Sequence, residues 1–232
     1  MSTALIVCAA PAPQGDVFYE RLITSHRGPV IAADGGGVLC HAHGRRPDLL
    51  VGDFDSITPE VLADLDVTVS DVRSAPVEKD VSDLDLALEA ARQLDVDRAV
   101  VVAAWSGRLD HTLSAIGSVL SCRGLTIDLA DPGMAGWMLD SEDRHSIEVS
   151  GPGATFSLFA FDDDAVVSCH GARYPIDGAR LGPLASLGLS NIIVSPTARV
   201  HVENGRLLVL THAIGGTPHA MLSTEHRSRG TV

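Results

Sequence analysis

The first 131 residues alternate between short apolar segments and segments with a helical pattern. A strand buried on both faces reads as a continuous apolar run, whereas a half-exposed strand alternates apolar and polar residues. Because helix-forming stretches separate the runs here, the order predicts a mostly parallel sheet covered by helices. Strands are expected at 4–10, 30–34, 48–51, 67–72, 98–104 and 125–131, and the main helices at about 16–25, 83–94 and 111–122.

The pattern changes after about residue 140. Short strand candidates follow one another, separated by Gly, Pro and Asp and without a helical pattern, which predicts an antiparallel β-sandwich or barrel. The candidates are 145–150, 154–161, 165–171, 199–205 and 206–212. Asn204-Gly205 is typical of the type I′ turn of a hairpin. We therefore expect an α/β domain over 1–138, a β-sandwich over 139–212 and a flexible tail over 213–232, which lacks apolar periodicity.

The charge of the chain limits the kinds of partner it can bind, and its cysteines indicate the compartment in which it occurs. The formal net charge is −13, and Lys79 is the only lysine among the 232 residues. Nucleic acids and anionic membranes are held by many Lys and Arg side chains, so neither is expected as a partner. No apolar run approaches the ~18 residues of a membrane span. The four cysteines lie in apolar surroundings without metal-ligand spacing, which indicates reduced thiols in the cytoplasm.

Four polar clusters follow predicted strands of the first domain. In open α/β sheets, ligands bind beyond the carboxyl ends of the strands. The clusters are "ADGGG" (33–37), "GDFDS" (52–56), "EKDVSDLD" (78–85) and "SGRLDH" (106–111). They bring several carboxylates, an arginine and a lysine to one rim of one sheet. This combination fits metal-assisted phosphoryl or pyrophosphoryl transfer.

Asp53 and Asp55 are the first candidates for metal ligands. On extended backbone, residues two apart face the same way, so both carboxylates would project together while Phe54 turns into the core. Two carboxylates this close stay ionised only with a cation between them, and Mg²⁺ is the natural choice. The alternative is a solvated turn in which Asp55 or Ser56 caps a following helix.

The other clusters also carry two interpretations. Ser82 and Asp85 resemble a capping box, which leaves Asp83 in the first helical turn, suited to the helix dipole but able to point at a metal. Arg108 is either a phosphate clamp at a strand-to-helix junction or part of a surface ion pair. Asp110 could cap the next helix, and His111 is either a ligand contact or only a first-turn residue.

The glycine turn after Asp34 gives a weaker signal. Gly35 and Gly36 allow close approach of the backbone to a ligand. The stretch is not a dinucleotide fingerprint, because position 40 is Cys rather than Gly, and the chain contains no Walker A sequence.

The motifs "ADGG", "PDLLVGDFDSI", "KDVSDLDLAL" and "GRLDHTLS", in this order, resemble those of the thiamine pyrophosphokinase (thiamine diphosphokinase) family. Residues 171–191 and the stretch "VHVENGRLLVL" resemble its C-terminal half, so the resemblance covers about 4–210. It implies an α/β nucleotide domain followed by a β-sandwich. It also implies pyrophosphoryl transfer from ATP to the hydroxyethyl group of thiamine with Mg²⁺, giving thiamine diphosphate and AMP. The implied assembly is a homodimer with thiamine between the α/β domain of one subunit and the sandwich of the other.

Carried over residue by residue, the resemblance implies three groups of site residues. Those of the metal are Asp53, Asp55 and Asp83, which with Arg108 and Asp110 form the implied catalytic set. Those on the nucleotide side are Asp34, Gly35, Gly36, Lys79, Arg108, Asp110 and His111. Those of thiamine are Tyr174, Ser190 and Asn191.

The sequence departs from the family at Trp105 and Ser106, which replace small residues and put the pocket's shape in question. Two other functions stay open: a pyrophosphokinase for another hydroxyalkyl heterocycle such as a pterin, and a non-catalytic nucleotide-binding module of the same fold.

Overall fold

The computed structural model describes residues 2–9, 17–65, 72–74, 81–105 and 108–212. The chain forms two compact units, Met1–Asp131 and Pro132–Val232. This division differs from the boundary expected after 138 by one strand, Met134–Asp140, which belongs to the second unit. Lys79 and the expected tail over 213–232 lie outside the described residues. Among the described helices, none combines the length and the apolar character needed to span a bilayer.

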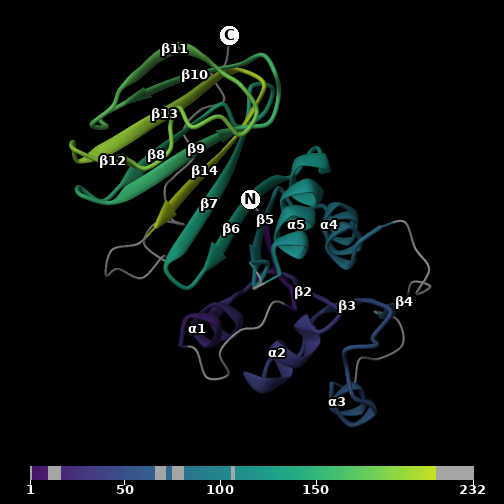
Figure 1. Cartoon of the computed structure of the whole chain (residues 1–232). Helices are drawn as coiled ribbons and strands as arrows, with labels where there is room; N and C mark the ends of the chain where they lie inside the picture. The colour runs from purple at the N-terminus through teal and green to yellow at the C-terminus, as the bar shows by residue number, and fades with distance from the viewer. Residues whose placement is uncertain (1, 10–16, 66–71, 75–80, 106–107, 213–232) are drawn as a thin grey trace. The chain divides into compact units, whose positions relative to one another are not determined.

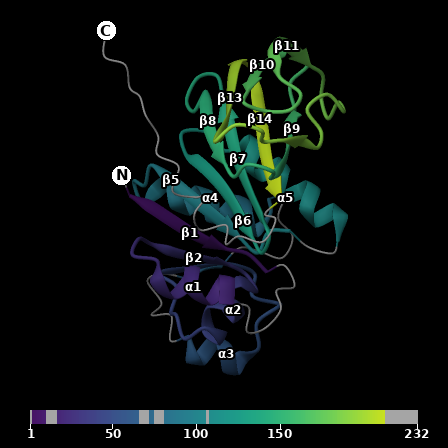
Figure 2. The ribbon, with the colours of Figure 1, turned by 90° about the vertical axis from the view of Figure 1, so that its left-hand side faces the viewer.

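The first unit contains a parallel sheet whose six strands lie in the order β6-β5-β1-β2-β3-β4. Helices α4 and α5 lie on one face of it, and α1 and α2 on the other (Figures 1 and 2). The strands are β1 (Thr3–Val7), β2 (Val30–Ala33), β3 (Leu49–Gly52), β4 (Val72–Ser74), β5 (Arg98–Val102) and β6 (Thr126–Asp131). The helices are α1 (Val17–Ser25), α2 (Gly36–Ala42), α3 (Pro59–Asp64), α4 (Asp83–Gln93) and α5 (Leu109–Ser121). The predicted parallel sheet with helices on both faces is confirmed.

Helix α3 has no counterpart among the predicted helices. It buries no residue, so it lacks the apolar stripe by which a helix is recognised in a sequence. It is capped by Thr58, whose side chain accepts a hydrogen bond from Val61 N at 3.4 Å. The suggestion that Asp55 or Ser56 caps a following helix is therefore wrong.

The second unit is a β-sandwich, as predicted. One sheet has the order β12-β9-β14-β7 and the other β11-β10-β13-β8, with antiparallel pairing throughout. The strands are β7 (Met134–Asp140), β8 (Ser146–Ser150), β9 (Thr155–Ala160), β10 (Ala165–His170), β11 (Ile176–Leu181), β12 (Asn191–Ile192), β13 (Thr197–Asn204) and β14 (Arg206–His212). Both sheets supply the shared core, with Trp137, Phe156 and Leu158 from one and Val167 and Val200 from the other.

Asn204-Gly205 does not close a hairpin, which corrects the expectation from the sequence. Strand β13 pairs with β10 and β8, whereas β14 pairs with β7 and β9. Gly205, at φ +81°, carries the chain from one sheet to the other. The Asn204 amide is used locally, because its Nδ2 donates to the backbone oxygen of Asp164 at 3.0 Å and to its Oδ2 at 2.8 Å.

Candidate functional site

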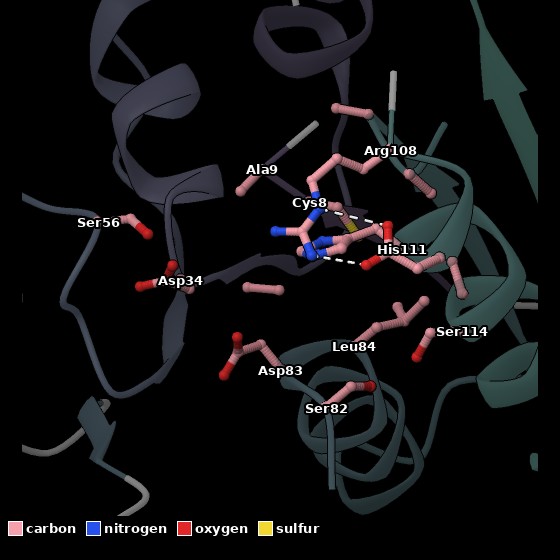
Figure 3. Close-up of a pocket in the computed structure, with 15 residues that line it drawn as sticks. Cys8, Ala9, Asp34, Ser56, Ser82, Asp83, Leu84, Arg108, His111 and Ser114 are labelled. Carbon is pink, nitrogen blue, oxygen red and sulfur yellow. Dashed lines mark hydrogen bonds and ion pairs between the residues drawn. The ribbon is translucent and has the colours of Figure 1, made fainter. Parts of the chain in front are cut away.

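A cavity of about 660 Å³ lies in the first unit, where the segments after β1, β2 and β5 meet the first turns of α4 and α5 (Figure 3). Strands β1 and β5 are neighbours, and the chain continues from them toward opposite edges of the sheet. Such a switch point is where open α/β sheets bind ligands. The cavity wall includes Asp34, Asp83, Arg108, Asp110 and His111, all of them predicted site residues.

Three carboxylates gather beside the cavity: Asp34, Asp53 and Asp55. Each offers an oxygen, and these atoms all lie within 4.8 Å of one another. Asp34 is only 7% exposed, and its Oδ1 has no hydrogen-bond partner among the described residues. A buried, unpaired carboxylate oxygen is costly without a cation, and a set of hard oxygen donors fits Mg²⁺. Asp34, expected on the nucleotide side, therefore lies among the candidate metal ligands.

A turn, rather than extended backbone, brings the side chains of Asp53 and Asp55 close together. Strand β3 ends at Gly52, and Phe54 has φ +65°. Phe54 is half-buried, so the prediction that it turns into the core along a strand is wrong. In the turn, Asp55 N donates to Asp53 Oδ1 at 3.3 Å, and Ser56 Oγ donates to Asp55 Oδ1 at 3.1 Å.

Asp83 borders this acidic cluster from the first residue of α4. The capping box is confirmed: Ser82 N donates to Asp85 Oδ2 at 2.9 Å, and Asp85 N donates to Ser82 Oγ at 3.1 Å. Asp85 is thus committed to the cap, while Asp83 faces the cavity near Asp34 (Figure 3). Gly52 permits this approach, because a Cβ there would lie 3.0 Å from Asp34 Cβ and 3.1 Å from Asp83 Oδ1.

Arg108 and Asp110 form an ion pair at the cavity rim. Arg108 Nη2 lies 2.6 Å from Asp110 Oδ2, and Nε lies 3.3 Å from Oδ1. Arg108 occupies the N-cap position of α5, so the expected cap by Asp110 is wrong. Both side chains remain exposed and line the cavity. His111 lies in the first turn of α5 and also lines the cavity. Two oxygens of a phosphate group can accept the same pair of hydrogen bonds from an arginine guanidinium.

The Arg108 guanidinium holds the pKa of Asp110 at about 2, mainly by hydrogen bonding, against an ordinary 3.8. Because this pKa is depressed in the folded protein, the pair's contribution is complete above pH ~4 and is lost as pH falls through ~2. We expect Arg108→Ala to return the Asp110 pKa toward 3.8, as followed by ¹³C carboxyl NMR. Arg199→Ala, which removes a partner of Glu148 in the other unit, should leave it near 2. A depressed pKa surviving in Arg108→Ala would assign the effect to the helix terminus instead.

Gly35 and Gly36 begin α2 directly after Asp34. Gly36 packs against the backbone of β1, since a Cβ there would lie 1.9 Å from the oxygen of Val7. Gly35 occupies the N-cap position, and a Cβ there would lie 3.0 Å from Ala9 Cβ. The missing side chain at Gly36 thus serves close packing of the helix on the sheet.

The three residues predicted for thiamine lie in the second unit. Tyr174 is 63% exposed, whereas Asn191 is 1% exposed. Asn191 Oδ1 accepts from Tyr174 N at 3.0 Å, and its Nδ2 donates to Tyr174 O at 2.7 Å. Ser190 has φ +53°, and its N donates to Ser157 Oγ at 3.1 Å. Asn191 therefore fixes the backbone that presents the Tyr174 ring.

Comparison with known proteins gives concordant results. Residues 20–129 match the family model of the thiamin pyrophosphokinase catalytic domain. The thiamine pyrophosphokinase of Bacillus subtilis (strain 168) is 26% identical over 189 residues, which covers 78% of this chain and 85% of that protein. A crystal structure of thiamine pyrophosphokinase from Bacillus subtilis superposes with a TM-score of 0.76 at 23% identity, covering 91% of this chain and 99% of that one. Thiamin pyrophosphokinase from Candida albicans gives 0.72 at 16% identity, with 91% and 89% covered.

Proposed function

Because residues 20–129 match the family model of the thiamin pyrophosphokinase catalytic domain, we propose that this chain is a member of that family and transfers a pyrophosphoryl group from ATP to thiamine. The thiamine hydroxyl oxygen bonds to the β-phosphorus of ATP, the bond to the oxygen shared with the α-phosphorus breaks, and AMP leaves. A cavity aspartate takes the hydroxyl proton. The observation that carries this proposal is the convergence of acidic residues and Arg108 on one cavity at the switch point of the sheet.

The acidic cluster is the proposed magnesium site. Asp34, Asp53 and Asp55 would hold the ion, and Asp83 borders them as a further ligand or as an acceptor of water bound to it. When bound, Mg²⁺ neutralises charge on phosphate oxygens. The buried Oδ1 of Asp34 supports the assignment, because in the described residues it has no other partner.

Arg108 is the side chain that we propose binds the phosphate groups of the nucleotide. Its guanidinium is held at the rim by Asp110 and is exposed toward the cavity. A triphosphate would compete with Asp110 for the same donors, so Asp110 keeps the arginine in place until the nucleotide arrives. Gly35, Gly36, His111 and Lys79 remain proposed residues of the nucleotide side, and Lys79 lies outside the described residues.

Tyr174 is the proposed wall of the thiamine site. The thiazolium ring is a cation, and the face of an exposed aromatic ring attracts a cation. The exposed ring of Tyr174, on backbone fixed by Asn191, fits this role. Ser190 directly precedes Asn191 in the chain and is proposed as a polar contact.

We further propose a cytoplasmic homodimer in which thiamine lies between the α/β domain of one subunit and the sandwich of its partner. Large exposed apolar side chains in one segment of the sandwich support an interface there. They are Tyr174, Leu184, Leu187, Leu189 and Val194. Leu109 and Leu113, exposed on α5, offer a second apolar strip beside the cavity. The four cysteines are free thiols, as a reducing compartment would leave them.

A coupled assay of AMP release tests the proposed function. We expect AMP only when ATP, thiamine and Mg²⁺ are all present, and none after addition of EDTA. AMP release with a hydroxymethylpterin in place of thiamine would reassign the acceptor. Calorimetric binding of ATP without AMP release under any condition would make the protein a nucleotide-binding module.

A further inference from the structure

Asp131 is a buried carboxylate behind the cavity wall that none of the roles above uses. It ends β6 and is 5% exposed. Its Oδ1 accepts hydrogen bonds from Tyr19 Oη and from Ala103 N, both at 2.7 Å. Its Oδ2 accepts from Trp105 N at 3.2 Å. Burial raises the pKa of Asp131 to about 6, and these donors oppose that rise.

The two backbone donors belong to the segment that carries β5 into α5. Strand β5 ends at Val102, Ala103 and Ala104 line the cavity, and Arg108 begins the helix. Strands β5 and β6 pair in register up to Val102 and Ala130, so Asp131 lies beside the point where the segment leaves the sheet. The Asp131 carboxylate thus accepts hydrogen bonds from Ala103 N and Trp105 N, at the start of the connection that leads to Arg108.

Ala103 adopts an unfavourable backbone conformation at this point. Its φ is +54°, a left-handed value that is unfavourable for an L-residue with a Cβ. Such a residue keeps this conformation only where its surroundings hold it. The hydrogen bond from Ala103 N to Asp131 stabilises Ala103 directly in this conformation.

Tyr19 ties a second element to the same carboxylate. It is a buried residue of α1, the first helix after β1. Cys8 and Ala9, which follow β1, also line the cavity, and Cys8 N donates to the backbone oxygen of Val102 at the end of β5 at 2.9 Å. Asp131 therefore joins α1 to the segment that forms one wall of the cavity.

We propose that Asp131 is a positioning residue of the nucleotide site: it fixes the backbone of 103–105 and thereby the cavity wall that Ala103 and Ala104 form. This inference rests on the proposed function. Asp131 touches no reacting atom, so its removal should weaken nucleotide binding more than it slows turnover at saturation.

Asp131→Asn is the sharpest test, because it keeps the shape and removes half of the acceptors. The donors approach both carboxylate oxygens, so an amide NH₂ group would face at least one N–H or O–H donor. Asp128→Asn is the matched control. Asp128 lies on the same strand, is fully buried, and pairs with Arg98 near the opposite end of β5.

The first readout is steady-state AMP release. We expect Asp131→Asn to raise KM for ATP by about tenfold with a smaller change in kcat, because a displaced loop loses alignment of the bound phosphate. Asp128→Asn should lower the thermal midpoint while leaving KM for ATP within about twofold of wild type. An unchanged KM in Asp131→Asn, or equal rises in both variants, would overturn the proposal.

The second readout is independent of turnover. The chain has two tryptophans, and Trp137 lies buried in the sandwich core, so a Trp137→Phe background leaves Trp105 as the sole indole reporter. In that background, Asp131→Asn should shift Trp105 emission to longer wavelength and weaken ATP binding measured calorimetrically. Unchanged emission and affinity would overturn the positioning role even if the wild-type chain released no AMP. Inactive wild-type protein with both shifts present would overturn the proposed function alone.

Discussion

Asp34→Asn is expected to lower kcat/KM for thiamine-dependent AMP release by about 10³-fold, or roughly 4 kcal/mol of transition-state stabilisation. The substitution leaves the shape of the side chain intact and removes its charge. Asp34 is the most buried member of the acidic cluster, and its Oδ1 has no alternative partner in the described part of the chain. An amide there would weaken Mg²⁺ binding, because the site would lose one of its few anionic ligands.

The thermal stability of Asp34→Asn without Mg²⁺ should rise, although its activity falls. Without Mg²⁺, three carboxylates whose oxygens lie within 4.8 Å repel one another. Asp34→Asn should therefore raise the thermal midpoint measured in EDTA, and Mg²⁺ should stabilise the variant less than the wild type. A purely structural aspartate would show a lower midpoint under both conditions.

The control is Asp95→Asn, which removes the same charge at the far end of α4. Asp95 is exposed with φ +53°, a conformation that asparagine also tolerates. Its activity and its response to Mg²⁺ should match the wild type. Near-normal turnover of Asp34→Asn at saturating Mg²⁺ would remove Asp34 from the metal site. The same result for Asp53→Ala or Asp83→Ala would remove those residues in turn.

Gly36→Ala is expected to destabilise the first unit by about 4 kcal/mol, beyond the usual range for a single added methyl group. The new Cβ would lie 1.9 Å from the oxygen and 2.7 Å from the carbon of Val7. Both are backbone atoms of β1, which pairs with β2 on one side and β5 on the other and cannot yield as a side chain would. The start of α2 would have to move away from the sheet. Urea unfolding measures the change.

Gly117→Ala makes the same substitution with the opposite expected sign. Gly117 lies inside α5, and a Cβ there meets no atom within 4 Å. Alanine should stabilise that helix by about 0.5–1 kcal/mol. If Gly36→Ala instead unfolded like the wild type but lost affinity for ATP, the glycine would serve ligand approach and not packing.

The fold of the first unit was predictable because both faces of its sheet are buried. Continuous runs such as 30–34 and 98–104 identified strands without any tertiary information. Turn chemistry was less informative. Asn204-Gly205 marks the point where β13 ends and β14 begins, but the choice of partner strands depends on contacts far away in the sequence.

The candidate site was predictable in part, and for physical reasons that differ among its members. Asp53 and Asp55 come together as expected, although through a turn at Phe54. Asp34 could have been assigned to the cluster, since Ala33 and Val51 are register partners on adjacent parallel strands and their carboxyl ends must meet. No sequence pattern indicates Asp131, because Ala103 and Trp105 donate to it through backbone N–H groups, which every residue except proline has.

The crossing at Gly205 has a consequence for how the sandwich assembles. It delivers β14 between β9 and β7, so the last described strand fills the middle of its sheet. Until β14 is in place, β7 and β9 each present an open edge able to pair with another chain. The ribosome must synthesise nearly all of the described chain before this sheet can close. During synthesis, the unit is therefore exposed to mispairing for longer than a sandwich assembled from successive hairpins.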